Sequence, residues 1–187
     1  MPAIPEPGEP LSDGHVSLRL AAERDIPEVL IAHQEDPGLA AALGLERAPS
    51  GAQLGRAMEE AQERREAGAG VTLTILEPGS DDCRGQIEAD RFDWEHAHAN
   101  LAVWLVPDAR GRRLAPRALA LAAEWLIEAA GLVRVQLMAP PENEAVIRAA
   151  LGAGFTREGV LRAHARAGGG RVDLAVLSRI ASDASGR

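Results

Sequence analysis

The chain has 187 residues and a formal net charge of −8, and apolar residues make up 46% of it. This length and composition fit one globular domain with a substantial core, and they argue against a disordered chain. All 20 basic residues are arginine, and the sequence contains neither lysine nor tyrosine. A lysine nucleophile, a lysine Schiff base, a P-loop lysine and a tyrosine general acid are therefore excluded.

The acidic balance argues against a partner that is nucleic acid or an anionic membrane, because binding either one needs a basic face. The apolar runs are too short to span a bilayer, and the first ten residues do not resemble a signal peptide. We therefore expect a cytoplasmic protein. The single cysteine, Cys83, excludes an internal disulfide, and His96 and His98 lack further ligands at standard spacing, so no metal site is expected.

Hydrophobic spacing and capping residues predict the first half of the fold. The expected elements are a strand over 15–20, helices over 25–33, 39–43 and 50–67, and strands over 71–76, 83–92 and 99–106. Residues 1–14 are rich in proline and glycine and are expected to form a flexible arm. The three later strands are separated by turn sequences, so we expect them to pair antiparallel.

The second half alternates between helix and strand. The expected elements are a helix over 116–130, a strand over 134–139, a helix over 144–151, and strands over 159–165 and 172–179. This order predicts an α/β fold of the α+β type, a mixed sheet with helices packed on it in a single domain over 15–180, followed by a polar tail over 181–187. The strand–helix–strand unit from Leu101 to Leu137 predicts two parallel neighbouring strands.

An arginine-rich loop over residues 110–117 lies between a predicted strand end and a predicted helix start. A helix start presents unpaired N–H groups and the positive end of the helix dipole, and successive loop amides can form a concave anion site. Arginine adds forked donors that match phosphate. The loop therefore predicts a pyrophosphate site, and a solvated basic loop is the alternative.

The segment from Trp104 to Ala115 resembles the acetyl-CoA signature of the GNAT superfamily of N-acetyltransferases, and most closely that of the RimJ/RimL-like ribosomal-protein-alanine acetyltransferases. Arg110 and Ala115 match fixed positions of the pattern Gln/Arg-x-x-Gly-x-Gly/Ala, whereas Arg113 stands at its central glycine. A second block, from Asn143 to Arg162, resembles the "Asn-x-Ala-Ser … Gly-Phe-x-x-Glu-Gly-x-x-Arg" segment of the same branch.

This resemblance implies a GNAT fold of about seven strands and about four helices. It also implies acetyl-CoA as co-substrate and direct transfer of the acetyl group to a primary amine, on a protein N-terminus or a small molecule, in a ternary complex. Similar proteins often form dimers, so a homodimer is open. The implied cofactor-binding residues are Leu105 and Val106 beside the pantetheine arm, Arg110, Gly111, Arg112, Arg113, Leu114 and Ala115 at the pyrophosphate, and Asn143 near the thiol.

The acid–base positions depart from the family pattern. Asn100 stands where many relatives carry a glutamate base, and Val146 stands where this branch usually has serine. The amine must lose a proton before it attacks, so a base or a water chain is needed. Glu88 and Asp90 share one face of a strand, and His98 shares the parity of Asn100. Glu88 is our first candidate for the base and His98 the second, and a solvated surface residue is the alternative for each.

These departures leave two other functions open. One is a non-catalytic sensor that binds acyl-CoA, and the other is an interaction module whose cofactor site has decayed through Arg113. The arginine-rich loop favours the enzyme, because a lost anion site would not require it. The sequence does not specify the acceptor amine or the acyl chain length.

Overall fold

The computed structural model of the chain describes residues 2–167 and 169–184. Its strands form one sheet in the order β1-β2-β3-β4-β5-β6-β8-β7. The strands are β1 (Leu11–Ser12), β2 (Ser17–Leu20), β3 (Gly70–Leu76), β4 (Gly85–Asp93), β5 (His98–Leu105), β6 (Arg134–Ala139), β7 (Thr156–Ala167) and β8 (Gly170–Ile180).

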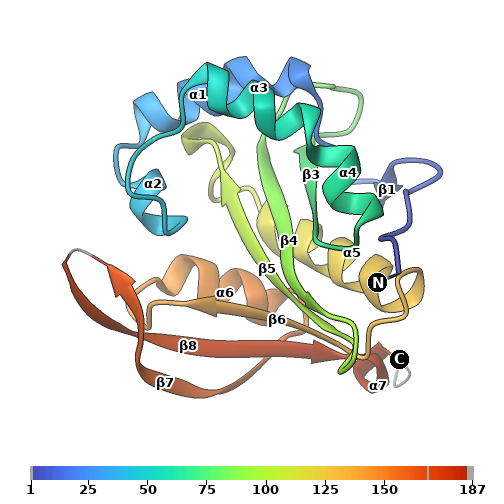
Figure 1. Cartoon of the computed structure of the whole chain (residues 1–187), viewed down its shortest axis with the longest axis vertical. Helices are drawn as coiled ribbons and strands as arrows, with labels where there is room; N and C mark the ends of the chain where they lie inside the picture. Colours follow the sequence, from blue (N-terminus) through green and yellow to red (C-terminus); the bar gives the residue numbers. More distant parts are fainter. Residues whose placement is uncertain (1, 168, 185–187) are drawn as a thin grey trace.

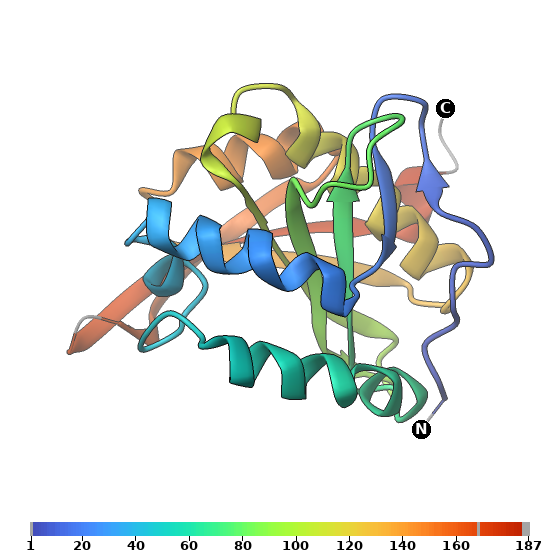
Figure 2. The ribbon, with the colours of Figure 1, turned by 90° about the horizontal axis from the view of Figure 1, so that it is seen from above.

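Helices cover both faces of this sheet (Figure 2). They are α1 (Ile26–Glu35), α2 (Leu39–Ala42), α3 (Gly51–Glu59), α4 (Ala61–Glu66), α5 (Leu114–Glu128), α6 (Glu144–Gly152) and α7 (Ala181–Ala184). The predicted mixed α/β architecture is confirmed. The described residues contain eight strands and seven α-helices, more than the expected counts of about seven and about four, partly because the predicted helix over 50–67 is divided at Glu60.

The predicted strand pairings are also confirmed. β3, β4 and β5 are antiparallel neighbours, and β5 runs parallel to β6 with Leu101 opposite Leu137. The parallel pair follows from the crossover through α5, which brings the chain back to the end of the sheet where β5 starts, so that β6 runs in the same direction. No helix in the described part of the chain is long and apolar enough to cross a membrane.

Alternation along β5 assigns its side chains to two environments. Ala99, Leu101 and Val103 are buried in the core on the side of α5. The opposite face of the sheet, on the side of α1 and α3, carries polar side chains from β4, β5 and β6, and we call it the open face (Figure 2).

The segment before His15 differs from the expected flexible arm. Ile4 is fully buried, and its N–H donates to the Arg65 carbonyl at 3.0 Å. Leu11–Ser12 pairs with β2 as the edge strand. An apolar side chain and a backbone pairing therefore hold this segment against the fold, although its proline and glycine content is typical of a loop. The predicted tail is helical over Ala181–Ala184, and its last three residues lie outside the described part of the chain.

The strands β5 and β6 separate along their length, and this opening positions the site. Their pairing begins at His98 opposite Arg134 and ends at Leu101 opposite Leu137. Beyond that point β5 continues to Leu105 with only β4 beside it. Figure 1 shows the two strands diverging toward the side where α2 and the tip of the β7–β8 hairpin lie.

Candidate active site

A groove of about 570 Å³ lies where β5 has lost its β6 neighbour. Its walls come from the segment around α2, the last residues of β5, the start of α5 and the first turns of α6. The lining residues are Asp36, Leu39, Ala42, Leu43, Val103, Trp104, Leu105, Arg110, Gly111, Arg113, Leu114, Ala115, Pro116, Asn143, Ala145, Val146, Arg148 and Ala149.

The arginine-rich loop turns sharply at one wall of this groove. Helix α5 begins at Leu114, two residues before the predicted start, so Pro116 lies in its first turn, where a missing N–H breaks no helical bond. Gly111 has φ +75° and Arg113 has φ +62°, and both are left-handed. Arg113 thus adopts the backbone conformation that the glycine of the family pattern adopts more readily.

The start of α5 offers donors to the groove. Arg113 occupies the position before the helix and makes no side-chain capping bond, so the first helical N–H groups have no side-chain cap. Leu114 and Ala115 line the groove directly beside these groups. Unpaired amides at the positive end of a helix dipole, next to arginine side chains, can hold a diphosphate.

The free edge of β5 forms the adjoining wall. The Leu105 carbonyl accepts hydrogen bonds from Nε and Nη2 of Arg110 at 3.2 and 3.1 Å. The same Nη2 is 2.5 Å from a carboxylate oxygen of Asp36, which follows α1. The hydrogen bond from Arg110 holds the pKa of Asp36 below its usual value, so this bridge is ionised at neutral pH. The Arg110 side chain therefore connects the end of β5 to the α1–α2 segment through hydrogen bonds to both.

Seven of the nine expected cofactor-binding residues line the groove, namely Leu105, Arg110, Gly111, Arg113, Leu114, Ala115 and Asn143. Asn143 also caps α6, because its Oδ1 accepts from the Val146 N–H at 3.3 Å. The other two expected residues point elsewhere. Val106 is 9% exposed within the core, and Arg112 pairs with Glu77.

Several other lining residues lie outside the motif from Trp104 to Ala115. Asp36, Leu39 and Leu43 approach from the α1–α2 segment, and Arg148 and Ala149 from the second turn of α6. For Leu39 and Leu43 the sequence signal is the apolar spacing of a short helix, which predicts burial but not the partner, whereas Arg148 and Ala149 lie within the second family-like block. Their place at the groove follows from tertiary packing.

The three candidate catalytic residues, Glu88, His98 and Asn100, share the open face and do not line the groove. Glu88 is directly opposite Ala102, beside the point where β5 and β6 separate. Its Oε1 is 3.6 Å from Nη2 of Arg64 on α4, and its side chain is 49% exposed.

His98 lies at the start of β5, at the closed end of the strand pair. Its Nε2 is 3.7 Å from Oδ2 of Asp93, and its buried Nδ1 has no hydrogen-bond partner among the described residues. Asp90 is directly opposite Asn100 on β4. Burial in the sheet face raises the pKa of Asp90, in spite of the positive charges of Arg91 and Arg64.

Two other titratable side chains have defined surroundings. His33 on α1 is 8% exposed, its ring centroid is 6.5 Å from that of Trp104, and burial lowers its pKa. Cys83 is buried, and burial raises the pKa of its thiol to about 12. The thiol is therefore protonated at neutral pH, which makes it a poor nucleophile.

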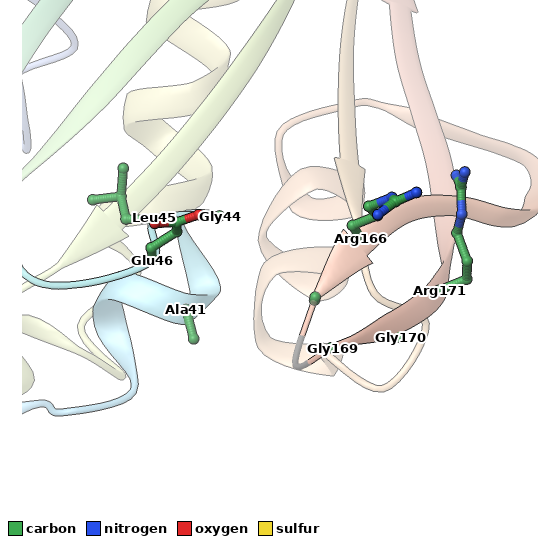
Figure 3. A pocket seen from close by; sticks show the side chains of 9 residues that line it. Ala41, Gly44, Leu45, Glu46, Arg166, Gly169, Gly170 and Arg171 are labelled. Atoms are coloured by element: carbon green, nitrogen blue, oxygen red, sulfur yellow. The ribbon is translucent and has the colours of Figure 1, made fainter.

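A second cavity, of about 540 Å³, lies between the loop after α2 and the tip of the β7–β8 hairpin (Figure 3). Leu45 and Glu46 lie on one side of it, and Arg166 and Arg171 lie on the other. The two arginines are directly opposite one another on β7 and β8.

Comparison with known proteins identifies the family. The model of the acetyltransferase (GNAT) domain matches residues 15–156, which is most of the chain. The protein belongs to the GNAT acetyltransferase family. The predicted resemblance to the GNAT superfamily is thereby confirmed. A search of curated protein sequences finds no match.

Solved structures share this fold at low sequence identity. RimJ of Mycobacterium smegmatis, in complex with a CoA disulfide, is 19% identical with a TM-score of 0.81 over 94% of this chain and 87% of that one. The ribosomal-protein-S5-alanine acetyltransferase of Vibrio fischeri is 16% identical with a TM-score of 0.78 over 92% and 96%. Spermidine N-acetyltransferase of Vibrio cholerae, in complex with CoA and spermine, is 16% identical with a TM-score of 0.77 over 91% and 98%.

Proposed function

We propose that this GNAT acetyltransferase transfers the acetyl group of acetyl-CoA to a primary amine, by direct attack of the amine in a ternary complex. One observation carries the proposal. The uncapped start of α5, turned into the groove by left-handed residues at 111 and 113, lies beside the free edge of β5. An anion site next to an unpaired strand edge suits a ligand with a diphosphate at one end and amide groups further along.

In this arrangement the chain's own residues bind and orient the cofactor. Amides from Gly111 to Ala115 would hold the diphosphate, with Arg110 and Arg113 as nearby cations. The free edge of β5 at Leu105 would lie beside the pantetheine arm, while the N–H of Val106, the other expected residue, donates to the Arg84 carbonyl. The acetyl group would then lie where β5 and β6 separate, with its reactive carbon accessible from the open face. Positioning of this kind accounts for a large share of the rate of a direct transfer.

The acceptor would approach across the open face. The Vibrio fischeri enzyme is named for an alanine of a ribosomal protein and the Vibrio cholerae enzyme for spermidine, so a protein N-terminus and a small polyamine are both candidate acceptors. Glu88 and His98 are our candidates for the group that takes the proton of the amine. Glu88 lies nearer to the separation of the strands.

The decisive experiment measures free CoA thiol released from acetyl-CoA in the presence of an amine panel. The panel contains peptides with N-terminal alanine or serine, spermidine, spermine and free amino acids. Thiol release that depends on the amine, with acetylated product in the mass spectrum, is the expected result. Binding of acetyl-CoA by calorimetry without turnover of any amine would favour the acyl-CoA sensor. No binding and no thermal shift would favour the decayed interaction module.

The same assay tests the candidate bases. Glu88→Ala or His98→Ala should strongly lower kcat/KM at neutral pH if that residue takes the proton, because the fraction of reactive amine then falls. Binding of acetyl-CoA should be unchanged in both variants. Unchanged rates in both would remove these two residues from the mechanism.

A further inference from the structure

A hydrogen-bonded chain crosses the open face from β7 to β5. The Glu158 carboxylate accepts from Nη1 and Nη2 of Arg134 at 2.7 and 2.6 Å, and from Ser178 Oγ at 2.7 Å. Nε and Nη2 of Arg134 also donate to Gln136 Oε1 at 3.2 and 3.1 Å. Gln136 Nε2 donates to Asn100 Oδ1 at 2.6 Å. We call Glu158, Arg134, Gln136 and Asn100 the Asn100 chain.

The direction of this chain is fixed by chemistry. A guanidinium can only donate, so the Gln136 amide must turn its oxygen toward Arg134. The NH₂ group of Gln136 then faces Asn100, so the Asn100 side chain must accept this hydrogen bond with its oxygen. The opposite orientation of either amide would place two donors against each other. Asn100 is therefore left with its NH₂ group as the free end of the chain.

This NH₂ group lies next to the place where β5 and β6 separate. Asn100 and Gln136 form the pair immediately before the last one, Leu101 with Leu137. Asn100 is 8% exposed, and within residues 2–167 and 169–184 no acceptor bonds to its Nδ2. The Nδ2 atom is not fully enclosed by the protein, so it is accessible to an oxygen atom that enters the opening between the strands and can donate a hydrogen bond to it.

We propose that Asn100 is the hydrogen-bond donor to the carbonyl oxygen of the acetyl thioester, and that Gln136 and Arg134 are positioning residues that hold it in this role. This inference rests on the proposed acetyl transfer. It also assigns Asn100 a different task from the glutamate that many relatives carry there. With its oxygen committed to Gln136, Asn100 can donate a hydrogen bond but cannot take a proton from the amine.

In the proposed step the amine adds to the carbonyl carbon, and the thiolate then leaves. The amine nitrogen forms a bond to the carbonyl carbon, and the electron pair of the C=O double bond moves onto the oxygen. The Asn100 N–H stabilises this negative oxygen, which is neutral in the bound thioester. The oxygen then restores the double bond, the C–S bond breaks, and the thiolate leaves as CoA. The nitrogen loses its proton to the base or to water, and the amide product remains.

Charged groups near Asn100 affect the pH dependence of kcat by which its role is tested. The titratable and charged groups on or against the open face include Glu88, Asp90 and Asp93 on β4, His98 on β5, Arg134 on β6, Glu158 on β7, His33 on α1 and Arg64 on α4. Hydrogen bonds from Arg134 and Ser178 lower the pKa of Glu158 to about 2. The anchor of the Asn100 chain therefore stays ionised across the pH range in which an enzyme assay is run.

The first test is Asn100→Asp, which keeps the shape of the side chain and an oxygen for Gln136 but loses the N–H donors. At pH 8 we expect kcat to fall about 100-fold with the KM for acetyl-CoA nearly unchanged, as when one donor to a developing oxyanion is removed. A protonated carboxyl regains an O–H donor. The ratio of variant to wild-type kcat should therefore rise as the pH is lowered from about 8 to about 5, because Asp titrates in the acid range.

The second test is Gln136→Glu, which still accepts from Arg134 but cannot donate to Asn100. We expect kcat to fall about tenfold, the equivalent of one hydrogen bond, with acetyl-CoA binding retained. Gln34→Glu, which adds the same charge at an exposed position of α1, is the matched control and should leave kcat unchanged. Thermal unfolding and calorimetric titration with acetyl-CoA check that each variant folds.

The outcomes distinguish failure of the role assigned to Asn100 from failure of the proposed acetyl transfer. If the wild-type protein turns over an amine and Asn100→Asp keeps its kcat, or loses activity in a ratio that does not change with pH, the donor role is overturned and acetyl transfer stands. If Gln136→Glu behaves like Gln34→Glu, the positioning role is overturned. If the wild-type protein turns over no amine of the panel, the proposed function fails and the role of Asn100 fails with it.

Discussion

The groove beside β5 and the open face of the sheet are assembled from the chain in different ways. The wall that suits a diphosphate comes from consecutive residues between Arg110 and Pro116, and its donors are backbone amides whose direction the local φ values set. The open face combines side chains of Glu88, Asn100, Gln136 and Glu158, which only the sheet brings together. A site made of consecutive amides tolerates changes of side chain that a site made of distant side chains does not.

Arg113 illustrates that tolerance. The family pattern has glycine there, yet the arginine adopts the same left-handed backbone at φ +62° and still lines the groove. On the open face a single change of residue type has a larger chemical consequence. An asparagine at position 100 offers a donor where a glutamate would offer a base, and Gln136 fixes which end of its amide is free.

Removal of the Asp25 side chain should have the largest effect on stability. It should loosen α1, which lies on the side of the open face where the acceptor would approach. Asp25 is 2% exposed and accepts from Arg19 Nη2 at 2.7 Å, Thr74 Oγ1 at 2.6 Å and the Ala22 N–H at 3.0 Å, which anchors the start of α1 to the sheet. Asp25→Ala leaves Arg19 partly unpaired and should lower the free energy of unfolding by about 3 kcal/mol at pH 7. Urea unfolding checks this value.

The effect of Asp25 also depends on pH. Burial alone would raise the pKa of Asp25, but the hydrogen bonds from Arg19 and Thr74 outweigh it and hold the pKa below its ordinary value. A lowered folded-state pKa contributes stability that is fully present above the unfolded-state pKa and is lost as the pH falls below it. The difference between wild type and Asp25→Ala should therefore shrink in acid, whereas the exposed control Asp82→Ala should change stability by less than about 0.5 kcal/mol.

A negative charge at the start of α5 should weaken acetyl-CoA binding without lowering the stability of the fold. Ala115→Asp puts a carboxylate beside the helical N–H groups that would hold the diphosphate. We expect acetyl-CoA to bind about 100-fold more weakly, because like charges in a partly enclosed site repel by a few kcal/mol. The melting temperature should not fall, since an acidic residue in the first turn favours the helix.

The control for this change is Ala129→Asp, which adds the same charge just past the other end of α5. Calorimetric titration should give it the affinity of the wild-type protein. Equal affinities of Ala115→Asp and wild type would place the diphosphate away from the start of α5 and would remove the main support for the proposed function.

The bridge between Asp36 and Arg110 joins two walls of the groove, and its removal should have a smaller effect. Asp36→Asn removes a negative charge from the groove and releases Arg110 from one of its partners. We expect acetyl-CoA to bind about three- to fivefold more tightly at low salt, since a partly exposed charge pair contributes about 1 kcal/mol or less. The two proteins should converge at 1 M salt, where screening removes the difference. Weaker binding by the variant would mean that the bridge holds the groove in its binding shape.

The smallest expected effect belongs to Arg113→Gly. Glycine adopts a left-handed backbone without the steric cost that other residues carry, so this variant should be up to about 1 kcal/mol more stable. Acetyl-CoA affinity should stay within threefold of the wild type if backbone amides carry most of the binding. A loss of tenfold or more would show that the arginine side chain is itself a phosphate ligand.

The sequence determined much of this protein because its local patterns have local causes. Alternation, capping residues and glycine positions predicted the strands, the parallel pair of β5 and β6 and the helices, and the motif from Trp104 to Ala115 predicted the family. These features depend on residues that are neighbours in the chain, so propensity and spacing suffice to find them.

Only the tertiary structure decided what depends on distant contacts. The burial of Ile4, the bridge from Asp36 to Arg110 and the chain from Glu158 through Arg134 and Gln136 to Asn100 join segments that sequence spacing does not relate. The direction of a buried amide is set by the donors and acceptors packed around it, and those come from three other strands. For that reason the sequence could name Asn100 as a candidate, while the hydrogen-bonded sheet defined which chemistry its side chain presents.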